Sequence, residues 1–145
     1  MSPHYIGSPN PGLILYLPNP PIRPSIEQPI DIPELIALNG NHWRKIFTIF
    51  AKLGAPRADW RQYRDNDLLK RKEAICFGDT LVHINARHIV AGKASWERLG
   101  LDQIDFDSLD DQQRVWKQGN VFLTPYPDYR QFPNELIEQL KPFLS

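Results

Sequence analysis

The chain alternates between short, mainly apolar runs and longer stretches in which apolar residues recur every three to four positions. The short runs are residues 13–17, 88–91 and 121–124, and each is followed by proline or glycine. Runs of this length, bounded by residues that break regular structure, are typical of buried β-strands. We therefore predict three short strands at these positions.

The clearest helical pattern covers residues 42–53, with Asn41 predicted as its N-cap and Gly54 and Pro56 ending it. Its apolar residues fall on one helical face: Trp43, Ile46, Phe47, Ile49, Phe50 and Leu53. Weaker patterns predict helices at residues 33–38, from 59 through the 68–77 region, at 95–99, at 109–118 with Ser108 as a cap, and after Pro133. Residues 80–84 fit a helix or a strand, and the helix is favoured because the next strand follows at once.

Short apolar strands separated by helices indicate a parallel sheet covered on both faces. The predicted fold class is therefore α/β, a small three-layer sandwich with a short, mainly parallel sheet. A chain of 145 residues fits one domain, which we place at residues 12–145.

Residues 1–33 contain nine of the fourteen prolines, so this segment cannot be mostly helical. We predict a proline-rich N-terminal arm that wraps the domain. Four isoleucines of this arm are expected to be buried: Ile22, Ile26, Ile30 and Ile32.

The formal net charge is zero, which argues against a protein dominated by phosphate contacts. The distribution is uneven: residues 41–98 carry twelve Lys/Arg against six Asp/Glu, and residues 99–112 carry five Asp and no base. The single cysteine, Cys76, is expected to be a buried core residue and cannot form an internal disulfide. The apolar runs are too short to span a bilayer and no secretory signal opens the chain, so cytoplasmic residence without membrane association is expected.

In parallel sheets, ligands bind beyond the carboxyl ends of the strands. This rule brings six polar residues towards one edge, and they are the ligand-binding candidates: Asn19, Lys93, Tyr126, Asp128, Tyr129 and Arg130. Prolines stiffen residues 125–130, so their tyrosines can stack on a planar ring and Arg130 can grip a carboxylate or phosphate. The alternative is structural: Lys93 is a solvated turn residue, the tyrosines pack on the core edge, and Asp128 and Arg130 form a local ion pair.

A second candidate surface lies in residues 57–72, where basic and aromatic residues interleave. Arg57, Trp60, Arg61 and Arg64 are the nucleic-acid candidates, with the arginines on one helical face if the helix starts early enough and Trp60 available for stacking. Neighbouring acidic residues can neutralise this segment through pairs three or four positions apart, so the alternative is a solvated helix face.

Other chemistries have little support. The four histidines, His4, His42, His83 and His88, lack ligand spacing, so neither a metal site nor a cofactor is expected. Ser95 lacks a nucleophile elbow. No catalytic residue is identified, and whether the protein is an enzyme stays open.

The predicted strand Ile89-Val90-Ala91-Gly92-Lys93 ends in Gly-Lys, and Tyr126-Pro127-Asp128 forms a loop after the last predicted strand. In these features residues 74–130 resemble a reduced uracil-DNA glycosylase domain, in which the corresponding loop contacts the nucleotide. The loop histidine is replaced by Tyr126, and no water-activating motif is present. The resemblance therefore implies the scaffold without glycosylase chemistry, and the chain also resembles small uncharacterised bacterial proteins.

Three functions follow from these observations. The first is a ligand- or nucleotide-binding α/β domain on a glycosylase-like scaffold. The second is a protein-interaction or structural domain. The third is DNA or RNA binding through the basic segment at residues 57–72.

Overall fold

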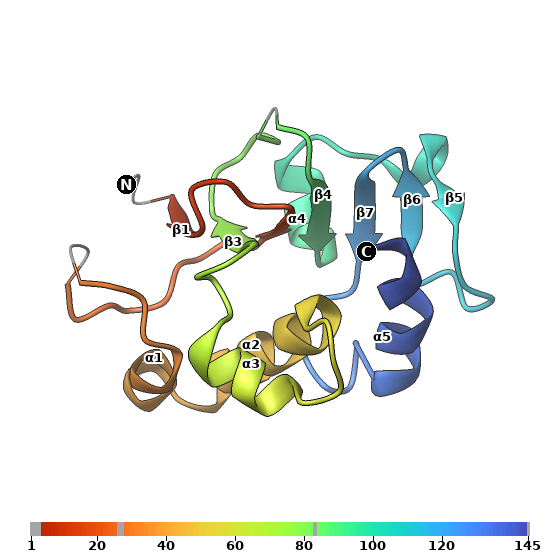
Figure 1. The fold of residues 1–145 in the computed structure, drawn as a ribbon. Helices are drawn as coiled ribbons and strands as arrows, with labels where there is room; N and C mark the ends of the chain where they lie inside the picture. Colours follow the sequence, from red (N-terminus) through yellow and green to blue (C-terminus); the bar gives the residue numbers. More distant parts are fainter. Residues whose placement is uncertain (1–3, 26–27, 83, 145) are drawn as a thin grey trace.

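The computed structural model describes residues 4–25, 28–82 and 84–144 and contains one mixed seven-stranded sheet with five α-helices (Figure 1). The strands are β1 (Tyr5–Gly7), β2 (Leu13–Tyr16), β3 (Glu73–Cys76), β4 (Arg87–Ala91), β5 (Asp107–Ser108), β6 (Trp116–Gln118) and β7 (Val121–Thr124). The α-helices are α1 (Ile32–Asn39), α2 (Asn41–Gly54), α3 (Trp60–Asn66), α4 (Lys93–Arg98) and α5 (Asn134–Leu140). Two short 3-10 helices cover Gln103–Asp105 and Lys141–Phe143.

The sheet has the strand order β1-β3-β2-β4-β7-β6-β5. Strands β3, β2, β4 and β7 are parallel, and the pairings β1–β3, β7–β6 and β6–β5 are antiparallel. The three predicted strands are therefore confirmed as β2, β4 and β7, which are adjacent. The parallel centre is buried on both faces, which explains why its strands are apolar runs without alternation.

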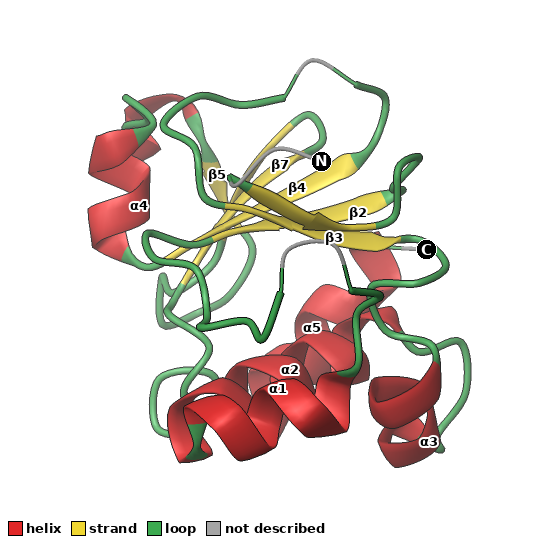
Figure 2. Cartoon of the chain, turned by 90° about the vertical axis from the view of Figure 1, so that its left-hand side faces the viewer, coloured by secondary structure: helices red, strands yellow, loops and turns green. Residues whose placement is uncertain are grey.

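The two faces of the sheet bury separate cores. On one face Leu13, Leu15 and Ile75 pack against α1, α2, α3 and α5. On the other face Ile14 and Val90 pack against α4 and the segments around it. Figure 2 shows the larger helical layer on one side of the sheet and α4 apart from it. This arrangement confirms an α/β fold, although the sheet as a whole is mixed.

Helix α2 supplies more of the larger core than any other helix, with Phe47 and Phe50 fully buried. Each fully buried phenylalanine contributes about 1.5–3 kcal/mol relative to an exposed one. The helix covers the predicted range, but Gly40 is its N-cap and Asn41 is its first residue. Asn41 accepts a hydrogen bond from the Arg44 side chain rather than capping the helix.

The predicted helix through residues 68–77 is wrong. Helix α3 ends at Asn66, Leu69 adopts a left-handed backbone with φ of 68°, and β3 follows. A short apolar segment fits a helix or a strand equally well in isolation, and here the space between β1 and β2 selects the strand. The helix favoured for residues 80–84 is also wrong, because the described residues of this segment form loop structure.

The predicted helix at residues 109–118 is wrong as well, because β5 and β6 form an antiparallel pair there. The Asp110 carboxylate accepts hydrogen bonds from the backbone N–H groups of Arg114 and Val115, at 2.6 and 3.0 Å. Its second oxygen accepts from the Arg114 side chain at 2.8 Å. An aspartate that satisfies turn amides in this way competes with a helix. Gln113 completes the turn with φ of 57°.

The segment predicted as an N-terminal arm supplies part of the sheet. Strand β2 belongs to it and lies in the interior of the sheet, between β3 and β4. Ile32 is fully buried and Ile30 is partly buried, but Ile22 is 66% exposed, so its predicted burial is wrong. The Asn39 side chain holds the Ile22 backbone by two hydrogen bonds of 2.8 Å, which fixes the segment without burying the isoleucine side chain. Ile26 lies outside the described residues.

The smaller core contains one buried polar pair. The Tyr16 hydroxyl accepts from the Val82 N–H at 3.1 Å and lies 2.8 Å from His88 Nδ1. The Ile84 carbonyl can only accept, so its 3.3 Å contact makes His88 Nε2 the donor, and in the neutral ring Nδ1 then accepts from the Tyr16 hydroxyl. Burial raises the pKa of Tyr16 to about 12. Cys76 is buried beside this pair, as predicted.

Candidate functional site

The predicted site lies where the parallel strands end. Strand β2 lies between β3 and β4 in the sheet. After β2 the chain forms β3 on one side of β2, and then crosses to form β4 on the other side of β2. Such a point, where the order of strands reverses, is the usual ligand position at the carboxyl edge of an open α/β sheet. The N-terminal end of α2 also reaches this edge, because Trp43 in its first turn packs against Phe77 at the end of β3.

Tyr126 is the residue best placed at this edge. A Cβ atom at Gly92, which has φ of 86°, would lie 3.3 Å from the Tyr126 ring, so the two strand-end loops are in contact. The Tyr126 hydroxyl lies 2.9 Å from His42 Nε2, and the two rings stack with centroids 5.6 Å apart. Burial raises the pKa of Tyr126, with a contribution from Asp128. The strand-end tyrosine is thus held by a helix that sequence reasoning did not connect with it.

Asp128 and Tyr129 both approach Lys45 of α2. The Lys45 ammonium lies 3.6 Å from Asp128 Oδ2 and 5.6 Å from the centre of the Tyr129 ring. The backbone N–H of Arg130 has the largest effect on the pKa of Asp128 and, together with the smaller effect of the Lys45 ammonium, holds it below its usual range. The predicted Asp128–Arg130 ion pair is thus a side chain-to-backbone hydrogen bond of 3.0 Å, and the salt-bridge partner is Lys45.

The remaining predicted ligand residues are not part of this cluster. Lys93 is exposed at the start of α4 and lines a separate hollow of about 270 Å³ with Trp96 and Asp102. Asn19 and the Arg130 side chain are exposed. The strand-end site therefore brings together Tyr126, Asp128 and Tyr129, and its binding role stays a prediction.

Arg98 is a residue of this edge that sequence reasoning missed. Its guanidinium donates to the Pro18 carbonyl at 2.8 Å and to the Phe77 carbonyl at 2.6 Å. It therefore ties the loops that follow β2 and β3 to α4. Nothing in the local sequence indicates this role, because its partners are backbone carbonyls far away in the chain.

A larger concave site lies at the opposite edge, where the parallel strands begin. We call it the α3 hollow: a depression of about 610 Å³ whose polar lining includes Arg57, Asp59, Tyr63, Asp67, Arg71 and Lys72. Arg71 is already paired with Asp67 at 2.9 Å. Among the described residues, neither Arg57 nor Lys72 forms a salt bridge. Two cations are therefore open to an incoming anion.

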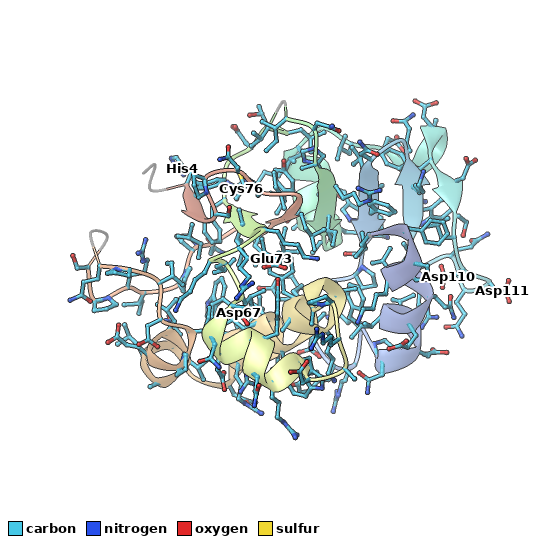
Figure 3. The ribbon with its side chains drawn as sticks, in the orientation of Figure 1. His4, Asp67, Glu73, Cys76, Asp110 and Asp111 are labelled. Atoms are coloured by element: carbon cyan, nitrogen blue, oxygen red, sulfur yellow. The ribbon has the colours of Figure 1, made fainter. Side chains whose placement is uncertain are left out.

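The α3 hollow has a buried acid behind its wall. Glu73, the first residue of β3, is 0% exposed, and Tyr63 donates to its Oε2 at 2.6 Å. Glu73 Oε1 has no hydrogen-bond partner in the described part of the chain. Figure 3 shows Glu73 between the sheet and the helical layer, with Asp67 closer to α3. A buried acceptor left without a partner costs about 1–3 kcal/mol, so this atom needs an explanation.

The ionisation of both partners is perturbed. Burial raises the pKa of the Glu73 carboxyl, and this effect exceeds the lowering by the Tyr63 hydroxyl, the Lys72 ammonium and the backbone N–H groups of Leu69 and Glu73, neither of which has hydrogen-bond geometry to Oε1. Burial and the adjacent Glu73 also raise the pKa of Tyr63, so the tyrosine keeps its proton and acts as the donor. Strongly perturbed acids beside a concave surface are more frequent at functional sites than elsewhere.

A second depression adjoins the α3 hollow. We call it the C-terminal hollow: it has a volume of about 440 Å³, and Gly54, Glu138, Lys141 and Leu144 are among its lining residues. Pro56 and Lys72 line both hollows. An alanine Cβ at Gly54 would lie 2.5 Å from Glu73 Oε2, so any larger residue here would force the carboxyl to move. The acid is thus enclosed by Tyr63 of the first hollow and Gly54 of the second.

The predicted nucleic-acid surface is rearranged by the late start of α3. The helix begins at Trp60, so Arg57 lies outside it and lines the α3 hollow instead of sharing a face with the other arginines. Lys52, Arg61 and Arg64 surround the Trp60 ring at 4.8, 5.0 and 5.6 Å from its centre. Arg64 also donates to the Thr48 hydroxyl at 3.0 Å. A nucleic-acid base that stacks on Trp60, as predicted, would compete with these three cations for the face of the ring.

In residues 4–25, 28–82 and 84–144, no group of three or more histidine, cysteine, aspartate or glutamate side chains is arranged to hold a metal ion. None of the helices in that part of the chain is long and apolar enough to cross a membrane.

Comparison with known proteins identifies one family. A family model described as "Family of unknown function (DUF6942)" matches residues 4–145. No protein of curated function and no solved structure matches the chain.

Proposed function

This chain belongs to DUF6942, a family of unknown function, so we propose a function from the geometry of the structure. The protein binds a small anionic molecule, such as a phosphate or a nucleotide, in the α3 hollow. The observation that carries the proposal is the pair of cations, Arg57 and Lys72, that line one hollow without salt bridges to described residues. Its volume of about 610 Å³ lies within the usual range of ligand pockets.

The chemistry of the two cations suits an oxyanion. The planar guanidinium of Arg57 offers paired N–H donors that match a carboxylate or phosphate, and the Lys72 ammonium adds a point charge. Tyr63 supplies an aromatic wall to the same hollow. The sequence pointed to the basic segment but placed the ligand-binding residues at the other edge of the sheet.

The test compares matched pairs of cations at the two edges. Inorganic phosphate and adenosine monophosphate are titrated by calorimetry into the wild-type protein, into Arg57→Ala/Lys72→Ala and into Lys45→Ala/Arg130→Ala. Loss of a charge-assisted hydrogen bond costs about 1.5–3 kcal/mol, so the first variant should bind at least about tenfold more weakly. The second variant removes the same charge and should bind like wild type.

Each other outcome is informative. If the Lys45→Ala/Arg130→Ala variant alone loses binding, the strand-end prediction is right and the α3 hollow is not the site. If no anion binds the wild-type protein, ligand binding at either edge is rejected, and the predicted protein-interaction role becomes the better hypothesis.

A second candidate function, nucleic-acid binding on a glycosylase-like scaffold, is supported by one contact. The loops that carry the resemblance touch each other, since Tyr126 lies against Gly92 at the end of β4. We propose that any DNA or RNA binding uses this edge or the cations around Trp60, without base excision. The expected results are affinity that falls steeply with salt and no release of uracil from uracil-containing DNA. Salt-independent affinity would contradict the electrostatic basis of this candidate.

A further inference from the structure

The buried carboxyl of Glu73 has features that an anion site alone does not explain. One of its oxygens accepts from Tyr63, while Oε1 lacks a partner among the described residues. Its surroundings are closed by Gly54, at which even a methyl group would collide with Oε2. A side chain needed only to accept from Tyr63 would not require a second, unsatisfied acceptor in a dry position.

The groups around the α3 hollow carry both signs of charge. Arg57 and Lys72 are cations without salt bridges to described residues, whereas Asp59 on the rim and Glu73 behind the wall are acids. Arg71 and Asp67 neutralise each other. A ligand that satisfies the remaining groups needs an anionic end for the cations and a hydrogen-bond donor for the acids.

We propose that the natural ligand of the α3 hollow is a zwitterion, a small molecule with a phosphate or carboxylate at one end and an ammonium group at the other. Arg57 and Lys72 hold the anionic end, and Glu73 Oε1 accepts from the ammonium group when the Tyr63 side chain swings outward. Glu73 is then the specificity-determining residue of the site. The inference rests on the proposed function, because it assigns the ligand class of that same hollow.

The route to the carboxyl runs past Tyr63. This residue lines the hollow, is 8% exposed, and forms a hydrogen bond to Glu73 through its terminal hydroxyl. Its helix, α3, has no side-chain hydrogen bond at the N-cap residue Asp59. An ammonium group beside the Glu73 carboxylate forms an ion pair as well as a hydrogen bond, which the uncharged Tyr63 hydroxyl cannot do.

The test uses two phosphates that differ only in the ammonium group, O-phosphoethanolamine and ethyl phosphate. We expect the wild-type protein to bind phosphoethanolamine at least about tenfold more tightly, the worth of one charge-assisted hydrogen bond. Glu73→Gln should abolish this preference and leave the affinity for ethyl phosphate unchanged. Tyr63→Phe removes the competing donor and should increase the preference, which gives a second readout if Glu73→Gln does not fold.

Proton release separates a ligand role from a purely structural one. Burial holds the pKa of Glu73 above its usual value, and an ammonium group beside Oε1 would lower it. At about pH 5, just above the ordinary pKa of a glutamate, binding of phosphoethanolamine should therefore release protons, measured by calorimetry in buffers of different ionisation enthalpy, and Glu73→Gln should abolish the release. Equal binding of both phosphates, without proton release, would overturn the zwitterion inference and leave anion binding intact. Failure of both phosphates to bind would reject the proposed function itself.

Discussion

Replacing Gly54 with alanine should lower the free energy of unfolding by about 1 kcal/mol. The new Cβ would lie 2.5 Å from Glu73 Oε2 and 3.2 Å from Cδ, well inside van der Waals contact. The carboxyl cannot move away freely, because it is fully buried and accepts from Tyr63 at 2.6 Å. Overpacking of this kind costs about 1–3 kcal/mol, and the better helix propensity of alanine at the end of α2 returns about 1 kcal/mol.

A double-mutant cycle assigns that cost to one contact. In the Glu73→Ala background the obstacle is gone, so Gly54→Ala should become stabilising by up to about 1 kcal/mol, its helix-propensity gain. In the Glu73→Gln background the side chain keeps its length, so the full cost should remain. The coupling between Gly54 and Glu73 is then about 1–3 kcal/mol.

The assay is urea unfolding followed by tryptophan fluorescence, with the slope checked for constancy among the variants. The reasoning is refuted if Gly54→Ala costs the same with alanine at position 73 as with glutamate. Such a result would mean that the methyl group meets another part of the molecule, and that the carboxyl of Glu73 is not enclosed by Gly54.

Three further predictions concern buried polar groups. Tyr16→Phe should lower the free energy of unfolding by about 1–3 kcal/mol, because His88 Nδ1 loses its donor; a change below about 0.5 kcal/mol in urea unfolding would argue against the pair. Burial acts to raise the pKa of Asp110, but hydrogen bonds from Arg114 and the turn amides hold this pKa below its ordinary value of 3.8. The ionised Asp110 therefore stabilises the folded protein above pH 3.8, and this stabilisation is lost as pH falls through the folded-state pKa. Asp110→Asn should therefore destabilise the protein at pH 7 but converge with wild type in acid, as thermal unfolding across pH would show. For Glu73 the sign is opposite, because burial raises its pKa above 4.5 and the native state retains a proton that the unfolded state loses. The free energy of unfolding of the wild type should therefore fall relative to that of Glu73→Gln as pH rises from 4.5. The fall should be at most about 1.4 kcal/mol per pH unit. A pH-independent difference between the two would show that Glu73 ionises alike in both states.

The sequence by itself determined the centre of the fold. Strands β2, β4 and β7 and helix α2 were predictable because local patterns dictate them: unbroken apolar runs for strands buried on both faces, and a stripe at helical spacing for a helix on one face. The side chains of Tyr126, Asp128 and Tyr129 share an edge for the same reason, since they follow one strand in a proline-stiffened loop.

Tertiary structure decided the rest of the architecture. Strand β3 has only four residues, and its conformation depends on β1 and β2, which are distant in the chain. Strand β6 pairs with β7, and the β5–β6 turn depends on an aspartate that binds backbone amides rather than on a residue pattern. Such segments have no strong preference of their own, so neighbours that arrive only on folding select their conformation.

Tertiary structure also decided where the concave site lies. Tyr63 and Glu73 are ten residues apart, and the left-handed turn at Leu69 that brings them together carries no sequence signal, because it falls on a leucine. Local periodicity reports which face of an element is buried. It does not report which polar groups from different elements meet there. That meeting places a carboxyl oxygen, without a hydrogen-bond partner among the described residues, behind a hollow lined by charges of both signs.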